Sequence, residues 1–403
     1  MFRLKQSVTS LGLALVPCLG LSPAWANDLL ATQEHQVTFD ANGHSTPMIA
    51  YDPDPSWSSP GAPLGNYIVY SQYPVVNGTV GNASVYYQQV GSNGAPIGAP
   101  VVVADSPENQ WLNAASGGNI VYTLSPSLGA YGDIVLYSTA TGSSRNLTSS
   151  GDSWSPRIHS TPIGPVTVWT EAMPNGSGQT VAYIVNSGVP VQTSVVGGPI
   201  PSASMANVGD RFIVWSALVN GQNDLAAYDM QQGVSFVVAN DPTVNEQNAT
   251  TEGPWIVYEA ATATETDILA INEDTAEHRL IVANGALNLR PEISGDWISY
   301  ESNVQGNSQI FIYNLDKGET FQVTNNSNDE HLNDLYCDDL THCIVTYIDN
   351  RNGNDGVFDT SLNLIPIGQA TPLPAALPLF ATGLGGLGLL GWRRKRKTQA
   401  AVA

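Results

Sequence analysis

Basic residues are scarce in this sequence, and their placement excludes one class of partner. Of the 14 Lys and Arg residues, two lie within residues 1–26 and five within residues 393–397, which leaves seven against 35 Asp and Glu. The part between the two ends therefore carries a net charge of −28. Nucleic-acid binding requires a basic face that neutralises phosphates, so we expect no nucleic-acid partner. An acidic surface that faces salt or divalent cations fits this charge better.

Motifs for nucleophilic catalysis and phosphate binding are also missing. No Gly-x-Ser-x-Gly sequence occurs, and the six His residues are scattered. The 38 glycines stand at turns and form no phosphate-binding loop. The sequence thus favours a protein that is not an enzyme, with the carboxylates discussed below as the open question.

Long apolar runs are confined to the two ends. Residues 1–26 combine Arg3 and Lys5, an apolar run and the small-residue box Ala24-Trp25-Ala26, which is typical of a secretory signal peptide. A lipoprotein signal at Cys18 is the alternative, although Pro17 stands where such a signal has a small residue. We therefore expect an exported protein.

The C-terminal residues 370–403 carry a second targeting pattern. Residues 373–392 contain no charge and are long enough to cross a bilayer, and the basic block at 393–397 predicts a cytoplasmic C-terminus. Pro372, Leu373, Pro374 and Ala375 precede this span. Together these features resemble the PEP-CTERM sorting signal in its VPLPA-type variant, with Thr371 in place of the usual Val. The resemblance implies transient insertion in the inner membrane of a Gram-negative bacterium that makes extracellular polysaccharide. It also implies an exosortase as partner, cleavage near Pro372 to Ala375 and a final place at the cell surface or outside the cell.

Residues 27–369 consist of repeats. Seven short strands of Ile or Val end in an aromatic residue, and successive marks are 42 to 52 residues apart. The aromatic residues are Tyr70, Tyr122, Trp169, Trp215, Tyr258, Tyr300 and Tyr347. Alternating apolar runs flank each mark, Gly, Asn and Asp break them, and no helical pattern intervenes. This pattern predicts an all-β fold of four-stranded blades, a β-propeller with seven blades, or six as the alternative.

The cleanest copy, residues 291–324, carries a family resemblance. Its Pro-x-Ile-Ser-Gly-x-x-Ile-x-Tyr pattern and its Ile-x-x-Tyr-Asn-Leu-x-x-Gly pattern resemble the TolB-type β-propeller repeat, especially in cell-surface and S-layer-associated proteins. The loop from Asp349 to Asp355 is similar to a loop of that group. The resemblance implies the propeller fold and leaves the activity open, because such repeats serve many roles.

The first repeat leaves two hypotheses for the N-terminal strands. Residues 47–51 would lead the first blade, or residues 36–39 would add a strand to the last blade and close the ring. Residues 27–34 are expected to form a flexible flank.

Cys337 and Cys343 are the two cysteines outside the signal peptide. Five residues separate them between two strand-like runs, so we predict a hairpin disulfide. Zinc binding with His342 or His331 is the alternative, although the spacing of these residues is unusual for zinc.

Candidate site residues are acids that follow the aromatic marks. Glu171, Glu259, Glu301 and Asp349 stand one or two residues after an aromatic mark, which places them at one end of the ring. They would either pair with the backbone of neighbouring loops or line the rim, where two acids could hydrolyse a glycoside. Asp349, Asn352 and Asp355 surround a glycine turn and form a weak candidate for Ca²⁺. Our leading hypothesis is a non-enzymatic surface module that presents one face to a polysaccharide or protein ligand. A polysaccharide hydrolase or lyase is the alternative.

Overall fold

The computed structural model of the chain describes residues 31–50, 66–77, 79–173, 178–184, 190–192, 206–219, 221–338, 342–353 and 355–363. Within these residues no helix has the length and apolar character needed to cross a membrane. The expected signal peptide and the expected membrane span at 373–392 lie outside the described residues, as do Pro372, Leu373, Pro374 and Ala375.

Antiparallel sheets of four strands make up almost all of the described part of the chain, which contains seven of them. The first three follow the chain in order, apart from one small hairpin formed by β4 (Val75–Val76) and β5 (Thr79–Val80). Their strands are β2 (Gly43–Ala50), β3 (Asn66–Tyr73), β6 (Ser84–Val90) and β7 (Val101–Ala104); β8 (Asn109–Ser116), β9 (Asn119–Ser125), β10 (Asp133–Ser138) and β11 (Ser143–Asn146); and β12 (Ser153–Thr161), β13 (Gly164–Ala172), β14 (Gly178–Ile184) and β15 (Pro190–Gln192).

The next three sheets repeat the same order. Their strands are β16 (Asn207–Val208), β17 (Phe212–Val219), β18 (Gln222–Asp229) and β19 (Val234–Ala239); β20 (Asn245–Glu252), β21 (Trp255–Ala261), β22 (Thr266–Asn272) and β23 (Glu277–Val282); and β24 (Asn288–Ser294), β25 (Trp297–Ser302), β26 (Gln309–Asn314) and β27 (Glu319–Gln322). Each sheet is a meander whose strands pair in chain order, as alternating runs separated by turn residues predict.

The seventh sheet joins the two ends of the described chain. It contains β28 (Glu330–Asp338), β29 (His342–Asp349) and β30 (Gly356–Asn363), and its fourth strand is β1 (Ala31–Gln36). Strand β1 pairs antiparallel with β30, from Ala31 opposite Asn363 to Gln36 opposite Phe358. Both predicted strands are present with shifted bounds. Strand β2 at 43–50 leads the first sheet, where 47–51 was expected, and β1 at 31–36 completes the last sheet, where 36–39 was expected. The expected flexible flank was wrong for residues 31–34, since pairing satisfies their backbone groups and covers the open edge of β30.

Apolar side chains fill the spaces between neighbouring sheets. Tyr70 and Trp215 are 1% exposed, and Tyr347 is fully buried. One cluster joins Trp297 of β25 to Tyr347 of β29, so it lies between the sixth and seventh sheets. Burial of one such side chain contributes about 1.5–3 kcal/mol, and it requires the neighbouring sheet. The aromatic marks are therefore packing residues.

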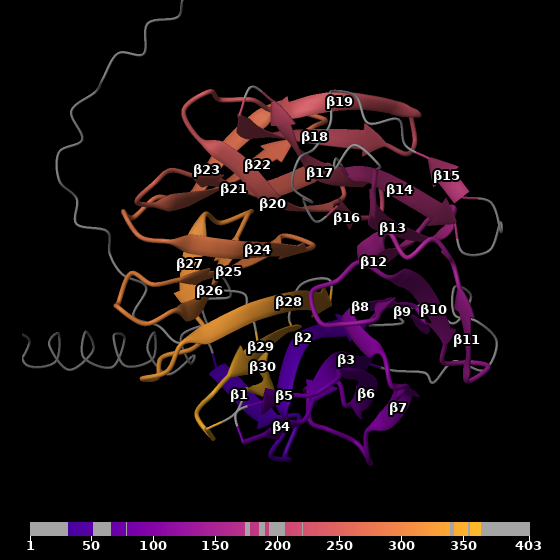
Figure 1. The fold of residues 1–403 in the computed structure, drawn as a ribbon. Coiled ribbons are helices and arrows are strands. Elements are labelled where there is room, and N and C mark those ends of the chain that lie inside the picture. Colours follow the sequence, from indigo (N-terminus) through magenta and orange to yellow (C-terminus); the bar gives the residue numbers. More distant parts are fainter. Residues whose placement is uncertain are drawn as a thin grey trace, which may run out of the picture.

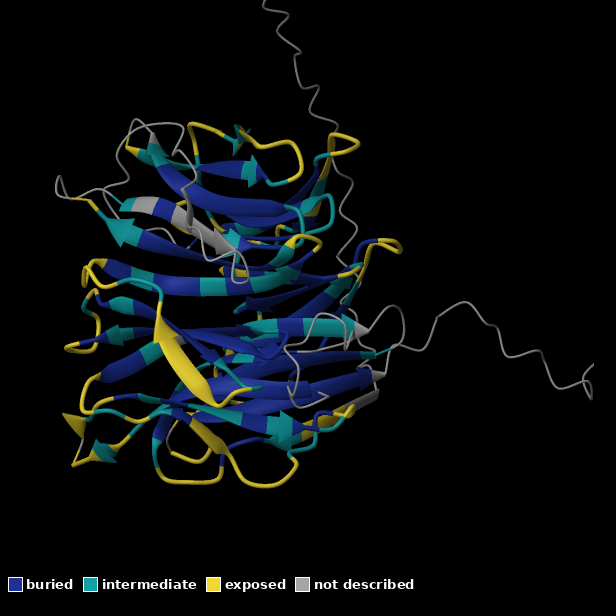
Figure 2. Ribbon diagram, turned by 90° about the vertical axis from the view of Figure 1, so that its right-hand side faces the viewer, coloured by how far each residue is buried: buried dark blue, intermediate teal, exposed yellow. Residues whose placement is uncertain are grey.

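The sheets follow one another around a central axis, and the seventh lies beside the first (Figure 1). Buried residues run through the middle of the strands, whereas exposed residues gather in the turns and outer strands (Figure 2). The first strand of each sheet lies innermost, which places its side chains around the axis.

Candidate functional site

Irregular pairing marks the innermost strands. Six of the seven first strands described show a register shift against their second strand, and the shifts lie at equivalent places. Thr46, Ser155, Asn248 and Arg290 stand at these shifts with φ angles of 49°, 54°, 48° and 51°. Such bulges re-aim the side chains that follow them.

The residues directly after the shifts form a ring of mixed chemistry. These residues are Met48, Ala114, Arg157, Thr250, Glu292 and Asp334. Arg157 belongs to the third sheet, whereas Glu292 and Asp334 belong to the sixth and seventh. In the circular order of the sheets, Arg157 therefore stands across the axis from the two carboxyl groups.

Two cavities meet at this ring. One has a volume of about 390 Å³ and is bordered by His44, Tyr73, Arg290, His331 and Asn333. The other has a volume of about 280 Å³ and is bordered by His159, Glu252 and Asp334. Arg157, Asn207 and Glu292 line both. We call the first the entrance cavity, and its size lies in the range of small-molecule sites.

The two carboxyl groups at the ring, Glu292 and Asp334, have raised pKa values. Burial, and then the carboxyl group of Asp334, raise the pKa of Glu292 to about 8. Burial raises the pKa of Asp334 to about 7, although the backbone N–H groups of Ile49 and Leu335 donate hydrogen bonds of 2.8 and 2.9 Å to it. Arg157 opposes both shifts. Near neutral pH, at least one of the two groups is therefore protonated.

Two of the four predicted rim acids are buried between sheets. Glu259 is fully buried, and its Oε1 accepts a hydrogen bond of 2.8 Å from the backbone N–H of Arg290 in the next sheet. Its Oε2 accepts a bond of 3.0 Å from Gln247. Glu301 is 3% exposed and accepts bonds from the backbone N–H of Leu332 at 3.0 Å and from the guanidinium of Arg290 at 3.2 Å. These carboxylates tie one sheet to the next and are not open to a ligand.

Asp349 lies in a third buried network, at the seventh sheet. It is 1% exposed and accepts hydrogen bonds from the backbone N–H of Arg351 at 2.6 Å and from Asn328 at 3.3 Å, and the Arg351 side chain also pairs with it. Arg351 reaches Glu330 at 3.4 Å and pairs with Glu34 of β1. A guanidinium thus occupies the space among three carboxylates.

The candidate calcium ligands belong to different networks. Asp349 pairs with Arg351, Asn352 is exposed, and Asp355 accepts a hydrogen bond of 3.1 Å from Tyr73. Across the described part of the chain, no group of three or more His, Cys, Asp or Glu side chains is arranged to hold a metal ion.

Glu171 is the remaining predicted rim acid. It lies near the end of β13, opposite Ser153, and is half-buried. Glu259, Glu301 and Asp349 lie at the same end of their strands, opposite Gln247, Leu289 and Glu330. The four acids therefore share one end of the ring, but at least three are committed to contacts within the protein.

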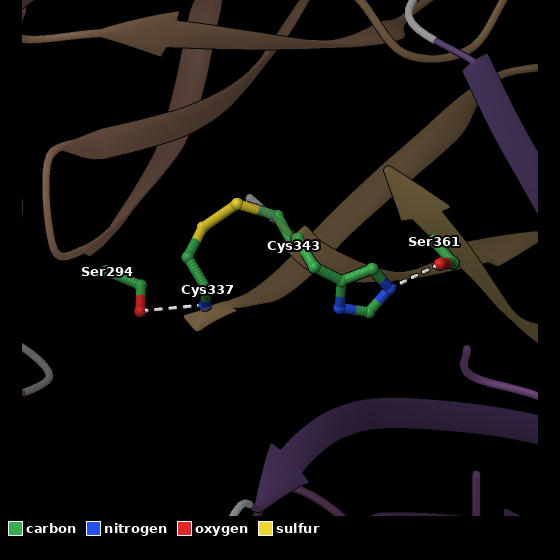
Figure 3. The surroundings of a disulfide bond; sticks show 5 residues. Ser294, Cys337, Cys343 and Ser361 are labelled. Carbon is green, nitrogen blue, oxygen red and sulfur yellow. Dashed lines mark hydrogen bonds between the residues drawn. A yellow bond between two sulfur atoms is a disulfide. The ribbon is translucent and has the colours of Figure 1, made fainter. Parts of the chain in front are cut away.

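The cysteines form a cross-link at the opposite end of the seventh sheet. Cys337 and Cys343 stand opposite each other on β28 and β29 and are joined by a disulfide, with Cα atoms 4.0 Å apart (Figure 3). The backbone N–H of Cys337 donates a 2.9 Å hydrogen bond to Ser294 of the sixth sheet, and His342 contacts Ser361 at 2.6 Å. The sulfur atoms are bonded to each other, and His342 faces Ser361.

Comparisons with known proteins establish the fold of this chain and do not establish its activity. No family model matches the chain, and no curated protein matches its sequence. The β-propeller domain of the Trilobed protease from Pyrococcus furiosus is 11% identical, with a TM-score of 0.55 over 84% of this chain and 99% of that one. The chain folds as a β-propeller.

A solved peptidase structure agrees with this fold. An acylaminoacyl peptidase from Pyrococcus horikoshii is 10% identical, with a TM-score of 0.52 over 80% of this chain. This propeller spans about half of that peptidase, or 52% of its length. TolB from Acinetobacter baumannii is 13% identical, with a TM-score of 0.43 over 83% of this chain and 96% of that one. The two matches with TM-scores above 0.5 show a shared fold, and at identities this low they carry no activity to this chain.

The sequence interpretation missed the ring residues of this propeller. Arg157, Glu292 and Asp334 stand in the first strand of their sheets, whereas the predicted rim acids follow the aromatic residue of the second strand. The signal was present, because charged residues within apolar strands need a cavity or a partner. Pro156 before Arg157 and Pro291 before Glu292 mark the bulges that turn these side chains toward the axis.

Proposed function

We propose that this protein is an exported, TolB-type β-propeller that binds extracellular polysaccharide in its entrance cavity without cleaving it. The cavity of about 390 Å³ on the axis is the observation that carries this proposal. Its border combines aromatic, amide and charged groups from six sheets and the loop before β30, which suits a ligand with many hydroxyl groups.

A hydrolase that uses rim acids is the weaker candidate. Glycoside hydrolysis requires two carboxyl groups about 5–9 Å apart with access to the sugar. Glu259, Glu301 and Asp349 accept hydrogen bonds from backbone groups or arginine and are at most 3% exposed. These three rim acids are therefore committed to contacts within the protein and do not offer a reactive pair.

Incubation with the exopolysaccharide of the source bacterium tests both candidates. We expect retention of the protein on immobilised polysaccharide and no new reducing ends or unsaturated sugars. Release of either product would overturn the non-enzymatic role. Absence of retention, under conditions where the protein is folded, would overturn polysaccharide binding.

The proposal extends to location and assembly. We propose that the signal peptide at residues 1–26 exports the chain, that an exosortase cleaves near Pro372 to Ala375, and that the seven sheets form a closed seven-bladed ring. Mass spectrometry of protein from the cell surface and the medium checks the cleavage, and a secreted form that still contains residues 393–397 would contradict it. An experimental structure of the secreted form tests the blade count.

A further inference from the structure

Positive charge is concentrated at the entrance cavity of a strongly acidic protein. Only seven basic residues lie between the targeting segments, and two of them, Arg157 and Arg290, line this cavity. Three others are paired with carboxylates elsewhere: Arg211 with Asp229, Arg279 with Glu277 and Arg351 with Asp349. Two of the six His residues, His44 and His331, also line the cavity.

The guanidinium group of Arg157 makes no direct contact with a described carboxylate. Its guanidinium donates a hydrogen bond of 3.2 Å to the carbonyl of Pro156, and no described carboxylate lies within ion-pair distance of it. The carboxyl groups of Glu292 and Asp334 face it across the axis, and at least one of them is protonated near neutral pH. Since a protonated carboxyl group does not cancel a guanidinium charge, Arg157 remains able to bind an anion.

Arg290 is similarly presented at the border of the cavity. Its side chain is 48% exposed, although its guanidinium contacts Glu301 at 3.2 Å. His331 lies on the same border, 3.7 Å from Glu301, and its contact with Glu301 raises its pKa. The acids at this cavity are Glu292 and Asp355, and His159, Glu252 and Asp334 belong to the adjoining cavity.

Amide side chains also line the cavity. Asn333 Oδ1 is a buried atom with no hydrogen-bond partner and belongs to a residue that lines the entrance cavity. Asn207 lines the same cavity, and amide side chains of this kind suit the hydroxyl groups of a sugar. Sugar hydroxyls and one anionic group together describe an acidic sugar.

We propose that the entrance cavity binds a uronate residue of a polysaccharide, with its carboxylate held by Arg157 and Arg290. This inference rests on the proposed function and narrows its ligand class. A singly charged carboxylate fits best because Arg290 is already shared with Glu301, which leaves Arg157 as the one guanidinium at the cavity without a carboxylate contact. The planar fork of a guanidinium matches the two oxygens of a carboxylate.

Isothermal titration of the purified protein with oligogalacturonate tests this inference. The matched probe is the methyl-esterified oligosaccharide, which keeps the sugar and removes the charge. We expect binding of the acid form and at least tenfold weaker binding of the ester. R157Q and R290N should each weaken binding of the acid form about 10- to 100-fold, since each removes a charge-assisted contact. Asparagine at position 290 tolerates the φ angle of 51° found there.

Control variants separate local from general charge effects. K317Q removes the same charge from an exposed turn between β26 and β27 and should bind like the wild type. Thermal unfolding confirms that each variant is folded, and the second arginine variant serves if the first is not. Equal binding of acid and ester with wild-type affinity in both arginine variants would overturn the uronate site while leaving polysaccharide binding intact. Failure of the acid form, the ester and the bacterium's own polysaccharide to bind would instead overturn the proposed function.

Discussion

The carboxylate of Glu301 accepts a hydrogen bond from the backbone N–H of Leu332 at a distance of 3.0 Å. Glu301 belongs to β25 of the sixth sheet and Leu332 to β28 of the seventh. The same atom, Oε2, also contacts the guanidinium of Arg290. One buried acid thus holds two first strands in place, and Glu259 repeats the arrangement one sheet earlier through the N–H of Arg290.

Removal of this acid should destabilise the protein strongly. We expect Glu301→Ala to lower the free energy of unfolding by about 3 kcal/mol, because the buried N–H of Leu332 loses its charged acceptor. Glu301→Gln should cost less, since the amide oxygen still accepts one bond. Guanidinium denaturation measures both, and E319A, at an exposed acid of β27, is the control. Wild-type stability of Glu301→Ala would show that the acid does not join the sheets.

Gly94 should be sensitive to a single added carbon. A Cβ at Gly94 would lie 2.3 Å from Oδ1 of the buried Asp359, and its φ angle is 83°. Gly98 has a similar φ angle of 71°, but a Cβ there would meet nothing within 4 Å. Since both substitutions cost backbone strain, G94A should lose about 1–3 kcal/mol more than G98A in chemical denaturation. Equal losses would mean that the loop shifts away from the seventh sheet at no cost.

Stability should fall as the pH rises from about 4 to about 9. Burial, and then the nearby charge of Glu34, raise the pKa of Asp359 from 3.8 to about 9, and its Oδ1 lies 3.0 Å from His35 Nδ1 of β1. Because the pKa is higher in the folded protein, the folded state binds the proton more tightly. The protonated Asp359 carboxyl therefore contributes fully to the free energy of unfolding below pH 4, and this contribution is lost progressively up to pH 9. Glu292 and Glu330, each with a pKa raised to about 8 chiefly by burial, act in the same direction.

Denaturation at pH 5, 7 and 9 measures this slope. Asp359→Asn keeps the shape of the side chain without its charge, so it should flatten the decline and be more stable than the wild type at pH 9. A wild-type free energy of unfolding that rises between pH 5 and pH 9 would contradict the proton on Asp359. E319A again serves as the control, since that acid is exposed.

Reduction of the disulfide should have a modest effect. The cross-link spans six positions along the chain, from Cys337 to Cys343, so a short-loop estimate gives about 2 kcal/mol. Denaturation with and without a phosphine reductant measures the difference, and the C337A/C343A variant should be insensitive to the reductant. Titration of two free thiols in the unreduced protein would show that the pair does not form the bond.

The fold was largely predictable because its signals are local. Alternation of apolar and polar residues, turn residues and the spacing of Tyr258, Tyr300 and their equivalents depend on short stretches of chain, and stacking then requires a ring of sheets. The strand β1 was missed because Ala31–Gln36 shows little alternation by itself. It becomes a strand only because β30, more than 300 residues later, offers an open edge.

The candidate site was less predictable, and the reason is register. Sequence position alone placed Glu259, Glu301 and Asp349 at one end of the ring, and that follows from equal repeats. Only the tertiary structure decided that their carboxylates bind the neighbouring sheet, and that bulges at Ser155, Arg290 and Asn333 turn Arg157, Glu292 and Asp334 toward a shared cavity. A one-residue bulge reverses which face a side chain occupies, and Arg157 lies 135 positions before Glu292 and 177 before Asp334. The sequence by itself thus determined the repeating four-stranded sheet. The arrangement of the sheets around the axis determined that Arg157, Glu292 and Asp334 line one cavity.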